Sequence, residues 1–115
     1  MENTFHRELK KEIDDYVALV YGVTKKFPKD EIYGLTSQFR RASLSVALNY
    51  IEGFARQRKT VDKLFLEIAY GSLKESKYLV DFSRSQGYLD EENHSVLAKA
   101  ADRIGAMLYG ILKKI

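Results

Sequence analysis

The 115-residue sequence has the length of one ordinary domain, and its 45% hydrophobic and 30% charged residues are typical of a folded globular chain rather than a disordered one. It contains no cysteine, which excludes disulfide bonds and Cys-ligated metal or iron–sulfur sites. The net charge of +3 is mild and leaves the function open.

The first predicted element is a helix over about residues 4–26. Its apolar residues repeat at alternating steps of four and three, the spacing of one helix face: Leu9, Ile13, Tyr16, Val20, Val23 and Phe27. Pro28 disfavours helical geometry at the residue before it, so we expect the helix to end there. We expect a connector over residues 28–35, in which Gly34 takes a positive φ.

The second predicted helix, residues 36–57, carries two stripes. We expect Thr36 or Ser37 to cap it. Its apolar stripe is Leu35, Phe39, Ala42, Val46, Asn49 and Gly53, and the polar Asn49 in this pattern is typical of a residue that sets register or oligomeric state. Its polar stripe is Gln38, Arg41, Ser45, Asn49, Glu52 and Arg56. This stripe either faces solvent or, with Glu31, forms a partly buried network inside the bundle or across a subunit interface.

The third and fourth predicted helices cover residues 60–86 and 91–114. Thr60 and Asp90 are their expected caps, and Gly87 is the expected stop of the third. Their apolar residues are Leu64, Phe65, Ile68, Ala69, Leu73, Leu79 and Phe82, then Leu97, Ala100, Ile104, Leu108 and Ile111. Because the connections are short, the sequence predicts one all-α domain over residues 1–115, an antiparallel up-down-up-down four-helix bundle.

Aromatic residues and glycines add two expectations. Phe39, Phe65, Tyr16 and Phe82 are predicted core residues, whereas Tyr33, Tyr50, Tyr70 and Tyr78 are predicted subunit contacts. Tyr50 with Arg56 and Arg58 is the nearest sequence candidate for a base-stacking platform. Gly71, Gly105 and Gly110 lie inside predicted helices, and we expect close helix contact at each to offset their low helix propensity.

Positive charge is concentrated in one segment. Residues 36–63 hold six Lys and Arg side chains against two carboxylates, whereas residues 1–35, 64–89 and 90–115 are each balanced to within one charge. This segment indicates either a surface for an anionic partner or an ordinary solvated face with ion pairs. The candidate nucleic-acid contacts are Arg56, Arg58, Lys59, Arg40, Arg41 and Lys63, of which Arg40 and Arg41 equally suit interface ion pairs.

Three runs of residues carry a family likeness: Phe27-Pro28-x-x-Glu31-x-Tyr33-Gly34-Leu35-Thr36-Ser37-Gln38-x-Arg40-Arg41-Ala42, Phe65-Leu66-x-Ile68-Ala69-x-Gly71-Ser72-Leu73, and Gly87-Tyr88-Leu89. Over about residues 13–90 the chain resembles the four-helix-bundle proteins encoded in intervening sequences of bacterial 23S rRNA genes. Ser76 departs from the family pattern, which usually has Leu at this position.

The resemblance implies a left-handed four-helix bundle that assembles as a ring-shaped homopentamer, and it implies no catalytic residues. The family is similar to the accessory protein of diversity-generating retroelements, a basic pentamer that binds nucleic acid and a reverse transcriptase. Glu31, Gln38, Arg41, Ser45, Asn49 and Glu52 are the candidate structural or interface network.

No catalytic or cofactor motif is present in the sequence. Glu91-x-x-His94 matches one half of a di-iron motif, but the only other histidine, His6, has no Glu three residues before it. There is no phosphate-binding glycine loop, nucleophile elbow or His-Glu-x-x-His motif. We therefore expect no enzyme activity, no metal and no cofactor.

We expect a homo-oligomer that binds nucleic acid, specifically structured RNA, through the basic segment. The alternative is a protein–protein interaction scaffold with no nucleic-acid role. The longest charge-free stretch, residues 42–51, is too short to span a bilayer, and Met1-Glu2-Asn3 does not resemble the start of a signal peptide. The expected location is therefore the cytoplasm, away from membranes.

Overall fold

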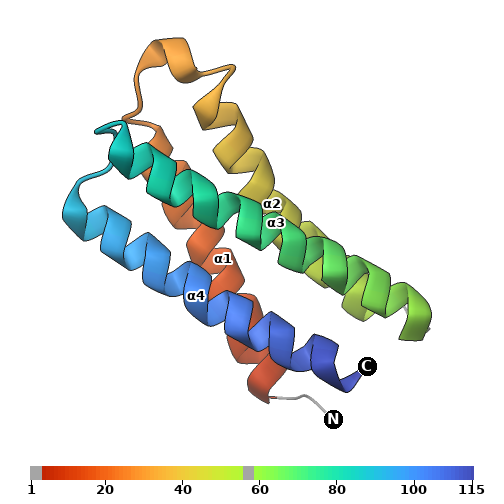
Figure 1. Cartoon of the computed structure of the whole chain (residues 1–115). Coiled ribbons are helices and arrows are strands. Elements are labelled where there is room, and N and C mark those ends of the chain that lie inside the picture. The colour runs from red at the N-terminus through yellow and green to blue at the C-terminus, as the bar shows by residue number, and fades with distance from the viewer. Residues whose placement is uncertain (1–3, 56–58) are drawn as a thin grey trace.

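A computed structural model describes the backbone of residues 4–55 and 59–115 and the side chains of residues 4–55 and 63–115. In this part of the chain the elements are α1 (Thr4–Thr24), a short 3-10 helix η1 (Lys29–Glu31), α2 (Leu35–Ala55), α3 (Lys59–Ser85) and α4 (Glu91–Lys114) (Figure 1). Over these described residues the fold is all-α with four α-helices, as predicted. Each helix begins and ends within two residues of its expected bounds, where those bounds lie inside the described residues.

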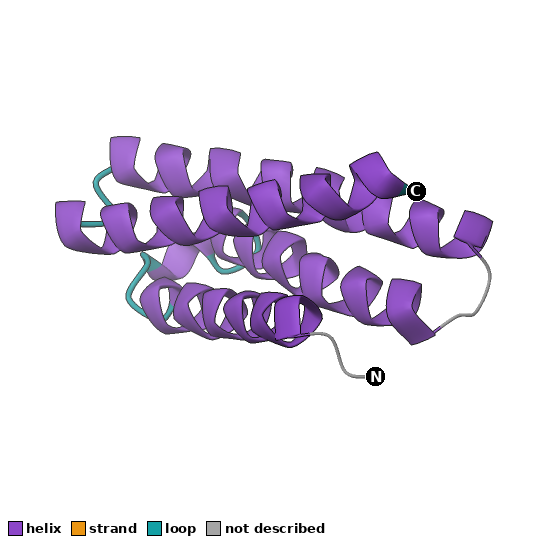
Figure 2. Cartoon of the chain, turned by 90° about the horizontal axis from the view of Figure 1, so that it is seen from below, coloured by secondary structure: helices purple, strands orange, loops and turns teal. Residues whose placement is uncertain are grey.

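The four helices pack side by side around one core (Figure 2). Each helix contacts the next along the chain, and α1 also contacts α4, so the arrangement closes on itself. His6 near the start of α1 bonds Tyr50 near the end of α2, and Arg84 at the end of α3 bonds Glu91 at the start of α4. The molecule measures 43 × 25 × 20 Å, so it is elongated, and the outward sides of its long helices form an extended surface around a narrow core.

The core residues of α1, α2 and α4 follow the predicted stripes. Leu9, Phe39 and Leu97 are among the side chains with no exposed surface. On α3 the prediction is partly wrong, because Leu64, Ile68 and Phe82 are exposed by 54%, 42% and 37%. The predicted Ala69 and Leu73 are buried, and the rest of the buried face of α3 is Leu66, Ser76, Val80 and Ser83. α3 carries two adjacent apolar stripes, and packing against α2 and α4 selects the one that contains two serines.

The start of α2 differs from the prediction. The helix begins at Leu35, whose N–H donates to Glu31 Oε1 at 3.0 Å, and the Gly34 carbonyl accepts from Gln38 N–H. Thr36 is therefore inside the helix and buried, and the predicted Thr36 or Ser37 cap is wrong. Gly34 does not have the predicted positive φ. It serves another purpose, because a Cβ at this position would lie 2.9 Å from Glu31 Oε1 and displace the carboxylate.

Two predicted helix ends at the α3–α4 connection are confirmed. Gly87 has a φ of +81°, and Tyr88 N–H donates to the Ser83 carbonyl at 2.9 Å, the pattern of a Schellman motif. The Asp90 side chain accepts from Asn93 N–H at 2.7 Å and caps α4. At the other end of α3, the helix starts at Lys59, so Thr60 lies inside it, and the Thr60 side chain lies outside the described residues.

Substituting Gly87→Ala should destabilise the chain by about 1 kcal/mol, because a Cβ is unfavourable at positive φ. Nothing lies within 4 Å of such a Cβ, so the cost comes from the backbone conformation alone. Gly22, which is exposed within α1 and equally uncrowded, is the matched control, and Gly22→Ala should stabilise. Urea unfolding of both variants measures the difference, and equal effects at the two positions would contradict the assignment.

One buried hydrogen bond crosses the core. The hydroxyls of Tyr16 and Ser76 are 2.8 Å apart, and Ser76 Oγ also donates to the Leu73 carbonyl at 2.8 Å. Because the serine proton points to Leu73, the Tyr16 hydroxyl is the donor to Ser76. Burial raises the pKa of Tyr16 to about 12. Ser76 thus pairs with the hydroxyl of Tyr16, which is the only polar atom of this fully buried side chain.

Candidate functional site

The basic residues predicted to contact nucleic acid do not form a single cluster among the residues that the structure describes. Arg40 is half-buried, donates from Nε to Thr24 Oγ1 at 2.8 Å and lies 4.9 Å from the centre of the Tyr21 ring, so it fastens α2 to α1. Arg41 and Lys63 are exposed. The remaining candidates, Arg56, Arg58 and the side chain of Lys59, lie outside the described residues.

The predicted polar network is divided between two places. At the middle of the α2–α3 contact, Asn49 Nδ2 donates to the Ser45 carbonyl and to Ser45 Oγ, which lies 2.8 Å from Ser72 Oγ. Asn49 and Ser45 are therefore partly buried between two helices of one chain. Of the other candidates on α2, Gln38 and Arg41 are exposed, and Glu52 is partly buried.

Glu31 belongs to a separate contact at one end of the molecule. Its Oε1 accepts from the first N–H of α2, and its Oε2 accepts from the Tyr88 hydroxyl at 3.1 Å. The Tyr88 ring also packs on Phe27, with ring centres 5.4 Å apart. Desolvation and the Glu31 carboxylate raise the pKa of the Tyr88 phenol. Glu31 thus holds the α1–α2 and α3–α4 connections together.

The tyrosines differ in exposure more than the sequence suggests. Tyr50 is only 4% exposed and lies 3.2 Å from His6, so the platform predicted around Tyr50 is wrong. Its helix face also carries Phe39 and Val46, which turn it toward the core. Tyr33, by contrast, is 94% exposed at the start of α2.

Two helices carry exposed apolar side chains on the sides opposite their buried faces. We call this surface the outer face, and it consists of Leu44, Leu48 and Ile51 on α2 and Leu64, Ile68, Tyr78 and Phe82 on α3. α2 and α3 lie against each other (Figure 1), so the two rows lie on neighbouring helices. Large exposed apolar areas mark interaction surfaces.

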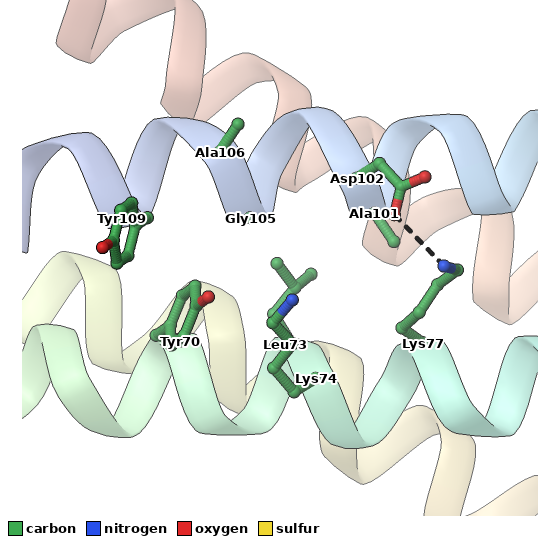
Figure 3. A pocket seen from close by; sticks show the side chains of 9 residues that line it. All are labelled: Tyr70, Leu73, Lys74, Lys77, Ala101, Asp102, Gly105, Ala106 and Tyr109. Carbon is green, nitrogen blue, oxygen red and sulfur yellow. Dashed lines mark hydrogen bonds and ion pairs between the residues drawn. The ribbon is translucent and has the colours of Figure 1, made fainter.

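A groove of about 220 Å³ lies between α3 and α4 (Figure 3). It is lined by Tyr70, Leu73, Lys74 and Lys77 from α3 and by Ala101, Asp102, Gly105, Ala106 and Tyr109 from α4. The two helices approach each other closely at Gly105, where a Cβ would lie 3.1 Å from Leu73 Cδ2. The expected close helix contact is therefore found at Gly105, but no atom lies within 4 Å of a Cβ built at Gly71 or Gly110.

Aromatic rings and lysines alternate around this groove. Tyr70 and Tyr109 face each other from the two helices, with ring centres 6.2 Å apart (Figure 3). Lys74 Nζ lies 5.3 Å from the centre of the Tyr70 ring, and Lys113 Nζ lies 5.7 Å from that of Tyr109. Lys77 Nζ pairs with Asp102 at 3.1 Å.

The residues that line this groove are not among the nucleic-acid contacts predicted from the sequence. A sum of charge along the chain hides its lysines, because α3 and α4 each contain equal numbers of acidic and basic residues over residues 64–89 and 90–115. One signal was available: Lys63, Tyr70, Lys74 and Lys77 share one helical stripe. The α4 half of the groove could be found only from the packing of the two helices.

The half-motif Glu91-x-x-His94 is part of an ion-pair cluster in the structure. His94 Nε2 lies 2.9 Å from Asp81 Oδ1, and Arg84 Nη1 lies 3.2 Å from Glu91 Oε1. Over the described ranges no group of three or more His, Cys, Asp or Glu side chains is arranged to hold a metal ion. None of the helices, as far as the structure describes them, combines the length and apolar character that a membrane span requires.

Comparisons with known proteins agree on one family. The family model described as 23S rRNA-intervening sequence protein matches residues 7–110. A solved structure from Bacteroides thetaiotaomicron, a protein of unknown function from the S23 ribosomal protein family, superposes with a TM-score of 0.88 at 17% identity, covering 96% of this chain and 99% of that one. At this identity the structural likeness shows the fold alone. No curated protein matches the chain in sequence.

Proposed function

Because the chain belongs to the 23S rRNA-intervening sequence protein family, we propose that it is a non-catalytic, cytoplasmic homo-oligomer that binds RNA through its basic segment. The proposed assembly is a ring of five left-handed, antiparallel four-helix bundles. The name of the family refers to where its genes lie and not to a binding activity. The exposed apolar and basic side chains of this chain support the proposal.

The observation that carries the proposal is the outer face of α2 and α3. Leu48 and Ile68 lie on neighbouring helices, and each has about half of its surface exposed in the isolated chain. Burying apolar surface is favourable by about 25 cal/mol of free energy for each Å², and rows left in water do not gain this free energy. A second copy of the chain offers an equally long apolar surface, and side-by-side packing would cover both.

Self-association would also multiply the basic segment. Arg41 lies on the same side of α2 as Leu44 and Leu48, so it borders the outer face of every copy. The segment over residues 36–63 has a net charge of +4. Five copies would bring about +20 into one assembly, enough for appreciable binding to RNA phosphates.

The double substitution Arg56→Ala/Arg58→Ala should weaken binding to a structured RNA and reduce the salt dependence of that binding. Each lost phosphate contact lowers the slope of log K against log salt by about 0.9 for a duplex. Fluorescence anisotropy titrations at three or more salt concentrations measure the slope. Lys10→Ala/Lys11→Ala removes the same charge from α1, where both lysines pair with aspartates, and should leave the slope nearly unchanged.

Two results would overturn the RNA-binding part of the proposal. One is the absence of binding by the wild-type chain at low salt, and the other is binding that does not respond to salt. A protein partner that remains bound after nuclease treatment would then favour the interaction-scaffold function.

A further inference from the structure

We propose that the groove between α3 and α4 is a binding site for single-stranded nucleic acid, with unpaired bases stacked on Tyr109 and Tyr70 and the backbone held by lysines. This site is separate from the basic segment named above, but it rests on the proposed function because the ligand is nucleic acid in both.

The aromatic part of the site is accessible from solvent. The Tyr109 side chain is 53% exposed, and its ring faces Tyr70 across the mouth of the groove (Figure 3). Every base offers a flat π surface, so a tyrosine ring binds it without reading its sequence. In a duplex the faces of each base are already covered by neighbouring bases. A site that stacks a base on a tyrosine ring therefore selects unpaired nucleotides.

The basic part is a track of lysines, of which Lys74 and Lys77 line the groove and Lys63 and Lys113 lie beyond its lining. Lys63, Lys74 and Lys77 lie on one stripe of α3 with Tyr70, and they span about 21 Å at 1.5 Å per residue. Lys113 approaches the track from α4, beside Tyr109. Four lysines thus stand against two carboxylates in this region, Glu67 on the same stripe and Asp102 in its pair with Lys77.

The direction of the track connects it to the basic segment. Lys63 is the last residue of that segment and the first lysine of the track. A strand that binds Lys63 can therefore continue along the same side of α3, past Glu67, to Lys74 in the groove. The groove and the outer face lie on different sides of α3, as Tyr70 and Ile68 show by their positions on the helix, so covering one leaves the other open.

The test uses a single-stranded uridine oligonucleotide about ten nucleotides long and the full chain. Tyr109→Ala should weaken its binding about 5- to 100-fold, the range measured for the loss of one stacked base. Tyr109→Phe keeps the ring and should retain most of the affinity. Tyr33→Ala removes a tyrosine that is 94% exposed elsewhere in the fold and should have no effect.

A second measurement locates the ligand without relying on a substitution. Ultraviolet crosslinking of a 4-thiouridine oligonucleotide, followed by mass spectrometry, should label peptides that contain Tyr70 or Tyr109. Lys74→Ala should lower the salt slope for the single strand by about 0.7, as expected for one phosphate contact. Equal competition by a duplex of the same length would contradict stacking.

The possible failures can be told apart. If the wild-type chain binds structured RNA but Tyr109→Ala binds the single strand normally, the groove proposal is wrong and the RNA-binding function stands. If the wild type binds neither RNA, both are wrong. If Tyr109→Ala changes the mass of the assembly in solution, the groove is a contact between copies, which also overturns the proposal.

Discussion

The double variant Leu48→Glu/Ile68→Glu should be a monomer of 13.3 kDa, whereas the wild type should be an oligomer several times heavier. In the isolated chain the Leu48 and Ile68 side chains are 57% and 42% exposed, so the glutamates remain hydrated and the core is unaffected. In an interface built on the outer face, two carboxylates per copy would lose their water without an opposite charge nearby. Removing one such charge from water costs several kcal/mol, enough to dissociate the assembly.

Size-exclusion chromatography with light scattering measures the mass, and circular dichroism checks that the helices are retained. Val96→Glu/Ile32→Glu is the matched control, because both side chains are exposed to a similar extent but lie away from the outer face. The control should keep the wild-type mass. A monomeric wild type, or a double variant that keeps the oligomer mass, would show that the outer face is not the contact between copies.

Raising the pH from 10 to 12 should remove about 2 kcal/mol of stability through Tyr16 alone. Its pKa is about 12 in the folded chain, against 10 for an ordinary tyrosine. The folded state therefore holds the phenol proton where the unfolded state has lost it, so this stability is complete below pH 10 and declines as the pH rises toward 12. One pKa unit corresponds to about 1.4 kcal/mol.

The free energy of unfolding of Tyr16→Phe should decline less steeply over this range. At pH 7 the variant loses the hydrogen bond to Ser76 and should be about 1 kcal/mol less stable than the wild type. Urea unfolding at several pH values gives both quantities. Tyr33→Phe, at an exposed site, should follow the wild-type curve. Identical pH dependence of Tyr16→Phe and the wild type would place the alkaline sensitivity in other groups.

Local signals were reliable where the deciding interaction is short-range. The Asp90 cap and the Gly87 stop were predictable because each depends on residues within five positions along the chain. The start of α2 was missed although its cap is equally local, because Ser and Thr are preferred caps and drew the prediction to Thr36 and Ser37. Glu31, four residues upstream of Leu35, caps the helix through its longer side chain, which leaves Thr36 inside the first turn.

The two proposed binding surfaces differ in how far the sequence indicated them. The excess of basic residues over residues 36–63 is visible without a structure, since it needs only a sum along the chain. The groove is not, because Tyr70 and Tyr109 are 39 positions apart and meet only when α3 packs on α4. The platform predicted at Tyr50 failed because its ring points to His6 and the core.

The sequence by itself determined the fold class, the four helices and the buried faces of α1, α2 and α4, because a 3.6-residue period with one apolar stripe leaves one way to face a core. Only the tertiary structure decided which of the two apolar stripes of α3 is buried. Burying Leu73 and Ser76 lets the serine accept from Tyr16 and turns Ile68 outward. That choice depends on the partner helices, and it creates both the outer face and the aromatic groove.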